Sequence, residues 1–298
     1  MDGMDAPFFT ANYRELPLSD DFMFGEVMRR EHICKLFLEA LLGKPIARIQ
    51  YITKQQDVSD SFTSHGIRMD VYLKDANNTV YCIEMQTTGG KILFQRIRYY
   101  QGTMDRHNLK KGEHYSKLPL SYIIMVCTAD LFGCGLAIYR RKVIMEGCPD
   151  VAYDDGSHVY ILNTAYTVPN ADSAILEYLQ CIRNNDVAPE RYGSALMKEI
   201  CPAIEEVRND PGKEAEYMTW QTKLMDVEYY AEQRGREEGL EKGIEKGRKE
   251  GREEGMQALV TSLKGLSFGR ETVVQQLAQQ YGLTLQTAAD KVDEYWAS

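Results

Sequence analysis

The sequence predicts an α/β fold with one central mixed sheet flanked by helices, followed by a helical region at the C-terminal end. Hydrophobic periodicity from residue 16 to about residue 165 gives the order helix, three strands, helix, three strands. Residues 121–128 are a nearly continuous apolar run, which is typical of a strand buried on both faces. After residue 207 the strand patterns end, and glycines recur every four residues in a highly charged segment.

The length of the chain, 298 residues, allows one large domain and a smaller appendage. The first residues are polar and show no period, which predicts a flexible arm over residues 1–15. We expect the α/β domain over residues 16–207 and a charged helix or linker over residues 208–256. A small helical region is expected over residues 257–298, with divisions near residues 267–269 and at Gly282.

Composition argues against several classes of protein. No stretch approaches the roughly 20 apolar residues of a membrane span, and no leader-like segment is found, so we expect a cytoplasmic protein without membrane contact. The seven cysteines form no C-x-x-C pair and the five histidines lack zinc-site spacing, which predicts reduced thiols and no zinc site. A net charge of −9 argues against indiscriminate nucleic-acid binding, although residues 91–117 are locally basic.

The helices and outer strands follow from spacing and breaker residues. Residues 19–41 are expected to form one helix with an N-cap at Ser19-Asp20-Asp21, and Gly43 and Pro45 end it. An amphipathic helix is expected over residues 91–108, and residues 172–207 are expected to be helical with breaks at Pro189 and Pro202. The remaining strands are expected over residues 48–56, 121–128, 135–143 and 159–163.

Two runs of alternating polar and apolar residues, 67–74 and 80–86, are joined by a turn-rich segment and predict a β-hairpin. A turn symmetric about Asn77 places Asp70 opposite Glu84. The same register makes one face apolar, and this face is expected to lie on the core. The other expected pairs are Met69 with Met85, Val71 with Ile83, Tyr72 with Cys82, Leu73 with Tyr81, and Lys74 with Val80.

The polar face of this hairpin carries the candidate chemistry. In this register the Cβ atoms of Asp70 and Glu84 lie roughly 4.5–5.5 Å apart, which is destabilising for two carboxylates unless a positive charge lies between them. Mg²⁺ would satisfy the pair and could bind a scissile phosphate, so the pattern predicts phosphodiester hydrolysis. Gln86 projects from the same face and could hydrogen-bond the attacking water. The alternative is a solvated sheet face, on which both carboxylates pair with Arg68, Lys74 or nearby arginines.

Several short motifs occur together in a fixed order along residues 16–165. They are Ser19-Asp20-Asp21-Phe22-Met23-Phe24, Gly66-Ile67-Arg68-Met69-Asp70-Val71, Ile83-Glu84-Met85-Gln86, and Arg96-Ile97-Arg98-Tyr99-Tyr100 followed by Gly112-Glu113-His114-Tyr115. In this order they resemble the recombination-promoting nuclease (Rpn) and transposase family of the PD-(D/E)XK nuclease superfamily. The glycine-repeat tail is also similar to the tails of such proteins.

The resemblance implies a restriction-endonuclease-like core, DNA as substrate, and cleavage that depends on Mg²⁺ or Mn²⁺. The metal ligands would be Asp70, Glu84 and the Met85 carbonyl, and the catalytic residues would be Asp70, Glu84 and Gln86. The sequence departs from the motif at two positions. Met69 stands where the motif has proline, and Gln86 replaces a lysine, which leaves the mode of water activation open.

Three further positions are candidates through the same resemblance. Asp21 matches an acidic position in the first helix of the family, although a helix N-cap explains it equally well. Arg96, Arg98 and Tyr100 match the helix that follows the site and are candidates for DNA binding. The alternative places Tyr100 in the core and the arginines on a solvated helix face.

The glycine-spaced tail is at odds with helix propensity. Its six interior glycines would cost roughly 5–6 kcal/mol of helix stability relative to alanine. Pairs of opposite charge at i,i+4 return only about 0.2–0.5 kcal/mol each. The segment is therefore either a solvated flexible linker or a helix against which another backbone packs, and in the second case we expect a homo-oligomer through residues 232–256. The glycines are Gly235, Gly239, Gly243, Gly247, Gly251 and Gly255.

Three functional hypotheses follow. The first is a Mg²⁺-dependent DNA endonuclease. The second is a catalytically weak or inactive DNA-binding or interaction module on a nuclease fold, which oligomerises through its C-terminal tail. The third is a scaffold organised by the tail.

Overall fold

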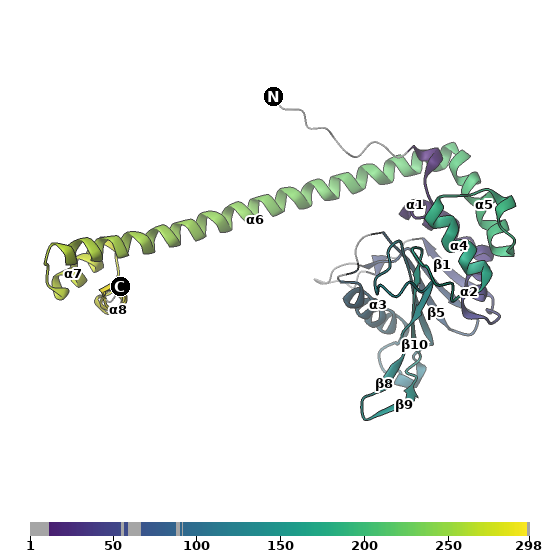
Figure 1. The fold of residues 1–298 in the computed structure, drawn as a ribbon, viewed down its shortest axis with the longest axis horizontal. Coiled ribbons are helices and arrows are strands. Elements are labelled where there is room, and N and C mark those ends of the chain that lie inside the picture. Colours follow the sequence, from purple (N-terminus) through teal and green to yellow (C-terminus); the bar gives the residue numbers. More distant parts are fainter. Residues whose placement is uncertain (1–11, 55–56, 59–66, 88–89, 91, 297–298) are drawn as a thin grey trace. The chain divides into compact units, whose positions relative to one another are not determined.

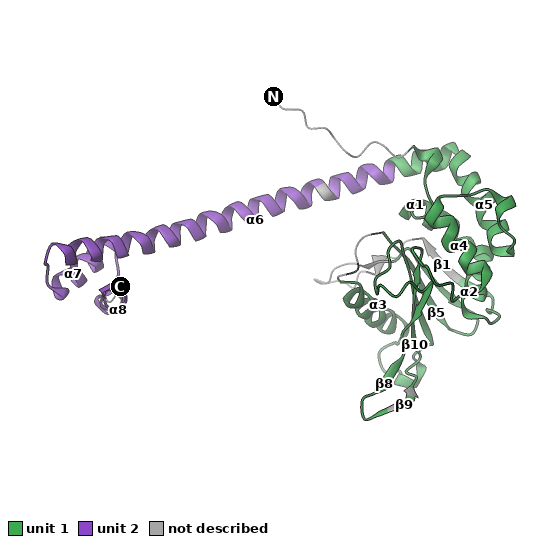
Figure 2. Cartoon of the chain, viewed as in Figure 1, with its two compact units in different colours: residues 1–218 green, residues 219–298 purple. Residues whose placement is uncertain are grey.

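The computed structural model describes residues 12–54, 57–58, 67–87, 90 and 92–296 (Figure 1). The chain divides into two compact units, residues 1–218 and residues 219–298 (Figure 2). The first unit contains the sheet, and the second is helical.

The central sheet of the first unit has the strand order β1-β4-β5-β6-β10-β7. Strands β5, β6 and β10 pair in parallel, whereas the β1–β4, β4–β5 and β10–β7 pairs are antiparallel. The strand bounds are β1 Ile49–Lys54, β4 Val71–Asp75, β5 Val80–Gln86, β6 Ser121–Cys127, β7 Ile138–Arg140 and β10 Ser157–Asn163. Two small sheets pair β2 (Asp57–Val58) with β3 (Ile67–Arg68), and β8 (Val143–Met145) with β9 (Cys148–Tyr153). The predicted α/β fold with one mixed sheet is confirmed.

Helices cover both faces of this sheet (Figure 1). Helix α3 (Leu93–Asn108) lies on one face and buries Leu93, Ile97 and Met104 in a cluster with residues of β5, β6 and β10. The helices α1, α2, α4 and α5 lie on the other face. Their bounds are α1 Asp21–Met28, α2 Glu31–Leu42, α4 Ser173–Asn184 and α5 Ala195–Asn209. Strand β6 is buried along its whole length, as the apolar run over residues 121–128 predicts.

The N-terminal helix predicted over residues 19–41 is two helices. The side chain of Asp20 caps α1 by accepting hydrogen bonds from the N–H groups of Phe22 and Met23. The chain then leaves helical geometry at Arg30, whose backbone is extended and whose guanidinium pairs with Glu206 of α5 at 2.7 Å. Because no glycine or proline marks this break, the sequence pattern does not show it. Helix α2 ends at Gly43 with a φ of 66°, as predicted.

Three other sequence predictions need correction. The flexible arm predicted over residues 1–15 does not extend over residues 12–15, because Tyr13 is buried and its hydroxyl donates to the carbonyl of Val207, and the rest of that prediction lies outside the described residues. The single strand predicted over residues 135–143 is split between β7 and β8, and β9 was not predicted. Pro202 does not break α5, because it lies on the exposed side of the helix, where the freed carbonyl of Lys198 can be hydrated.

The charged segment is a helix over its described length. Helix α6 (Pro211–Gly265) begins in the first unit, where the ring of Tyr217 lies 5.5 Å from that of Tyr13 and 5.3 Å from that of Phe22. The flexible-linker alternative for residues 208–256 is therefore wrong. In the second unit the end of α6 packs with α7 (Arg270–Tyr281) and α8 (Leu285–Trp296), which are divided where the sequence predicts. Their shared core is Met256, Val260, Val273, Val274, Leu277, Ala288, Val292 and Tyr295.

Two further observations bear on the class of protein. All seven cysteines are free, and five of them are buried. None of the helices in the described part of the chain combines the length and the apolar character that crossing a bilayer requires.

Candidate active site

The β4–β5 hairpin has the predicted register over residues 71–74. Val71 pairs with Ile83 and Lys74 with Val80, as symmetry about Asn77 requires. The ladder stops at Val71, because residues 69–70 bend between β3 and β4. The expected ladder pairs of Met69 with Met85 and of Asp70 with Glu84 are therefore absent, and Met69 packs in the cluster beneath α3 instead.

Asp70 and Glu84 meet at the point where the ladder ends. The backbone N–H of Asp70 donates to Oε1 of Glu84 at 2.9 Å. In return, Oδ2 of Asp70 accepts a hydrogen bond from the backbone N–H of Met85, also at 2.9 Å. These two bonds fix both carboxylates relative to the same short stretch of backbone, so the two acids predicted from the sequence are neighbours in the structure.

Helix α3 closes over this side of the hairpin. The hydroxyl of Tyr100 donates to Oε2 of Glu84 at 3.3 Å, and the Arg96 guanidinium lies 3.7 Å from the same oxygen. Arg96 also donates to the Tyr100 hydroxyl oxygen at 3.0 Å and to the side-chain oxygen of Gln86. Only 2% of Glu84 and 7% of Gln86 are exposed. The face is therefore not solvated, as the alternative has it, because α3 buries Glu84 and Gln86, but the pairing of Glu84 with a nearby arginine is present in the contact with Arg96.

Burial also changes the proton affinity of both acids. Burial, together with the nearby charge of Asp70, raises the pKa of Glu84 from 4.5 to about 8. Burial raises the pKa of Asp70 from 3.8 to about 6, against the effect of the hydrogen bond from Met85. At neutral pH the pair therefore tends to hold a proton, which a cation between the carboxylates would displace.

Helix α1 contributes two more groups. The negative charge of Asp21 is close enough to raise the pKa of Asp70, and the positive charge of Arg29 acts in the opposite direction. The N-cap of α1 is Asp20, so capping does not explain Asp21, whose side chain is exposed. The Nε–H of Arg29 donates to the backbone carbonyl of Asp70 at 3.3 Å.

Arg29 was not among the residues that the sequence predicted for the site, and Arg98, a candidate for DNA binding, does not lie with Arg96 beside the carboxylates. Arg29 lies inside the helix predicted over residues 19–41, and its contact depends on the break that the pattern did not reveal. Arg98 follows Arg96 by about 200° around α3. It is exposed and lines a different cavity, between α3 and strands β7 and β10.

A comparison with models of protein families shows which family the region around the site resembles. Residues 21–147 match the model of the PD-(D/E)XK nuclease family transposases. This region, less than half of the chain, is therefore similar to that family. The match contains both carboxylates, the helix α3 and the strand β6 that supports β5. A search of curated proteins found no match to the chain.

The PD-(D/E)XK family usually uses a divalent metal, and the donor atoms at the hairpin suit one. In an extended strand the N–H and C=O of one residue face the same neighbouring strand. Because the N–H of Met85 donates to Asp70, the Met85 carbonyl faces the same edge. Two carboxylates and a carbonyl are hard oxygen donors of the kind that Mg²⁺ prefers. Within the part of the chain that the structure describes, no group of three or more His, Cys, Asp or Glu side chains could hold a metal.

The lysine position of the PD-(D/E)XK motif is filled differently in this chain. Gln86 has no charge, but its side-chain oxygen is bonded to Arg96. A guanidinium, one-third exposed, thus lies beside the residue that replaces lysine. The positive charge at this position comes from α3 and not from β5.

Proposed function

We propose that this protein is a Mg²⁺-dependent DNA endonuclease, with Mn²⁺ as a substitute metal. The observation that carries the proposal is the pair of hydrogen bonds that joins Asp70, Glu84 and Met85. A buried pair of carboxylates with raised pKa values lowers the stability of the folded protein. Such pairs are common where an enzyme binds a cation or moves a proton. The family of residues 21–147 supports a nuclease-like function.

Asp70, Glu84 and the Met85 carbonyl would hold the metal. When bound, a divalent ion would lower the pKa of a coordinated water and offset negative charge on the phosphate. Asp70 and Glu84 are held by backbone N–H groups and by Tyr100, so their oxygens need little reorganisation when the ligand arrives.

Arg96 supplies the positive charge that Gln86 lacks. Its guanidinium bonds to Gln86 and to Tyr100 at the same time, which fixes the planar group beside Glu84. From this position it can stabilise negative charge that develops on a phosphate oxygen. Gln86 is then a positioning residue for Arg96 as well as a candidate partner of the attacking water.

Asp21 is an additional acid at the rim of the site. Its side chain is exposed and close enough to Asp70 to affect the pKa of that carboxyl. An acid in this place could orient a water or a second cation from the side opposite α3. We propose this role for Asp21, whereas Asp20 acts as a cap.

A plasmid-nicking experiment tests the proposal. Supercoiled plasmid incubated with the full-length protein and Mg²⁺ is expected to be nicked, and EDTA is expected to prevent nicking. Asp70→Ala and Glu84→Ala should abolish cleavage, whereas Glu190→Ala, which removes an exposed acid in the connection between α4 and α5, should not. Equal nicking by all variants would contradict the proposed site. Salt-sensitive DNA binding without any metal-dependent nicking would favour the alternative of an inactive DNA-binding module.

Homo-oligomerisation through residues 232–256 remains a prediction. A Cβ built on Gly235, Gly239, Gly243, Gly247 or Gly251 meets no atom within 4 Å, so this side of α6 is open in the chain. An open glycine stripe would allow close approach of another backbone, and light scattering on the full-length protein tests whether a second copy binds.

A further inference from the structure

A separate cavity lies on the flank of α3 opposite Arg96. It is enclosed by α3, the edge strand β7 and the strand β10, and its volume is about 580 Å³. Pockets that bind small molecules have volumes of roughly 300–1,000 Å³. Its floor is apolar, because Ile97 of α3 and Val159 and Ile161 of β10 are buried there.

Three aromatic rings form one end of this cavity. The ring of Phe132 lies 6.0 Å from that of Phe94 and 4.5 Å from that of Tyr139. Phe132 is 40% exposed and Phe94 is 59% exposed, so a ligand can reach both rings. The loop that carries Phe132 is folded around Asp130, whose carboxylate accepts hydrogen bonds from Gly135 N–H, Phe132 N–H and the Tyr139 hydroxyl. The aromatic end is therefore held in place before any ligand binds.

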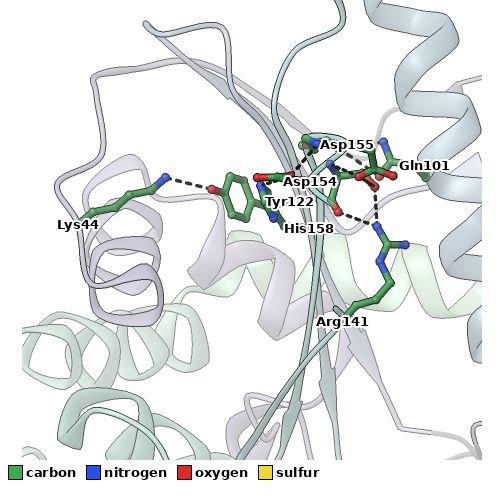
Figure 3. A network of polar contacts seen from close by, with 10 residues as sticks. Lys44, Gln101, Tyr122, Arg141, Asp154, Asp155 and His158 are labelled. Carbon is green, nitrogen blue, oxygen red and sulfur yellow. Dashed lines mark hydrogen bonds and ion pairs between the residues drawn. The ribbon is translucent and has the colours of Figure 1, made fainter. Parts of the chain in front are cut away.

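The other end of the cavity is polar and mostly basic. Figure 3 shows Gln101 and Asp155 together with Arg141, whose guanidinium donates to the backbone carbonyl of Ser157 at 2.6 Å. Asp155 accepts hydrogen bonds from the N–H and the hydroxyl of Ser157.

Three more basic residues, Arg98, Arg140 and Lys142, are exposed at the cavity. Four basic residues and one acid, Asp155, line the cavity, so it favours an anionic ligand that also offers hydrogen-bond donors to a carboxylate.

The cavity and the candidate active site are joined by two elements. Helix α3 carries Arg96 towards Glu84 on one flank and Phe94 towards the cavity on the other. The loop with Phe132 leaves β6 next to Gln86, where the N–H of Thr128 donates to the Gln86 carbonyl at 3.1 Å. A polymer held at the active site would thus pass close to the aromatic end.

We propose that this cavity binds one unpaired nucleotide of a single DNA strand. The base stacks on the ring of Phe132, the tilted ring of Phe94 contacts its edge, and the flanking phosphates lie at Arg98 and Lys142. Every base has a stacking face, and aromatic rings beside basic residues are the usual means of holding single strands. Asp155 favours a nucleobase over an aliphatic acid, because its carboxylate accepts from exocyclic amino groups but repels a carboxylate. The proposal rests on the proposed function for DNA as the polymer and adds a preference for unpaired substrate.

A binding experiment in EDTA tests the cavity independently of cleavage. Fluorescence anisotropy of a labelled mixed-sequence oligonucleotide and of its duplex gives the two dissociation constants for the full-length protein. Phe132→Ala is expected to raise the Kd for the single strand about tenfold, as alanine substitution of a stacking ring does, and the Kd for the duplex less than about twofold. Lys142→Ala is expected to weaken single-strand binding and to lower its salt dependence.

Matched variants control for nonspecific effects. Phe268→Ala removes a ring of similar exposure, 46%, in the second unit, and Lys111→Ala removes an exposed lysine that does not line the cavity. Both should bind as the wild type does. In a Phe132→Trp variant, single-stranded DNA should quench the added indole fluorescence.

Several outcomes would overturn the proposal. These are an unchanged single-strand Kd in Phe132→Ala, an equal loss for single strand and duplex, an equal loss in Phe268→Ala, or a free mononucleotide that binds as tightly as the strand. Displacement of the strand by decanoate but not by a mononucleotide would show an aliphatic occupant. A wild-type protein that binds single strands through Phe132 but does not nick plasmid with Mg²⁺ would contradict the proposed function and leave the cavity assignment supported.

Discussion

Replacing Glu84 by glutamine should make the metal-free protein more stable at neutral and alkaline pH. In the folded protein the pKa of Glu84 is raised from 4.5 to about 8 by burial and by the charge of Asp70. The folded state therefore holds a proton that the unfolded chain releases, and wild-type stability falls as pH rises from about 4.5 to about 8. Glutamine keeps the shape of the side chain but does not ionise, so this loss disappears.

The size of the effect follows from the shift. Each pKa unit corresponds to about 1.4 kcal/mol. Because Asp70 and Glu84 titrate as a coupled pair, part of the shift belongs to Asp70. We therefore expect the free energy of unfolding of the wild type to fall by on the order of 3 kcal/mol between about pH 4.5 and about pH 8, relative to that of Glu84→Gln. Saturating Mg²⁺ should restore about 2.7 kcal/mol to the wild type when its concentration is 100 times the Kd, and nearly nothing to the variant.

The assay is urea unfolding of the full-length protein, followed by the near-ultraviolet circular dichroism of its tyrosines. It is run at about pH 5 and about pH 8, in EDTA and in Mg²⁺. Glu190→Gln, at an exposed site, serves as the matched loss of a carboxylate. If Glu84→Gln keeps the wild-type dependence on pH, or if the wild type gains stability as pH rises, burial does not control this carboxyl and the reasoning is refuted.

Three further sets of substitutions separate roles within the site and the tail. Arg96→Gln should slow single-turnover cleavage about 100-fold, the usual effect of losing a donor to developing negative charge, and adding Gln86→Lys should recover part of the rate; no recovery would argue against a shared cationic role. Asp20→Ala should lower the free energy of unfolding by about 1 kcal/mol through the lost cap, whereas Asp21→Ala should leave stability within about 0.5 kcal/mol and reduce cleavage. Alanine at Gly239, Gly243 and Gly247 should stabilise helix α6 by about 1 kcal/mol per residue, and circular dichroism should show the increase in helicity. If light scattering shows a dimer that the alanines dissociate, the stripe is packed against a second copy, and an unchanged mass contradicts that prediction.

The hairpin could be predicted from the sequence because its signals are local. Alternation with period 2 and a turn centred on Asn77 fix the register of four observed pairs, and that register brings Asp70 to Glu84. The position of both carboxylates on one face could be predicted from the pattern, because a shift of the register by one residue would move the apolar side chains from the core face to the polar face. The bend at residues 69–70 could not be predicted, because it depends on how Asp70 is bound by Met85 and by Arg29 of another helix.

The features that the sequence did not reveal depend on contacts between distant elements. The break at Arg30 has no glycine or proline to mark it and coincides with the ion pair to Glu206 of α5. Pro202 was expected to end a helix, yet its position on the exposed side allows α5 to continue. Helix propensity alone favoured a linker for the glycine repeat, and the structure has a helix there.

The question that Gln86 raised has an answer in the following helix. Strand residues two apart, Glu84 and Gln86, project from one face, and helix residues four apart, Arg96 and Tyr100, project from one flank. When α3 packs on that face, the two pairs meet as an acid, an amide, a guanidinium and a phenol. A lysine at position 86 would have brought a second cation next to Arg96, at the cost of repulsion in a buried site. In the proposed site, Arg96 would therefore carry the positive charge that a lysine at position 86 supplies in the motif, and the Gln86 amide would orient it through their hydrogen bond.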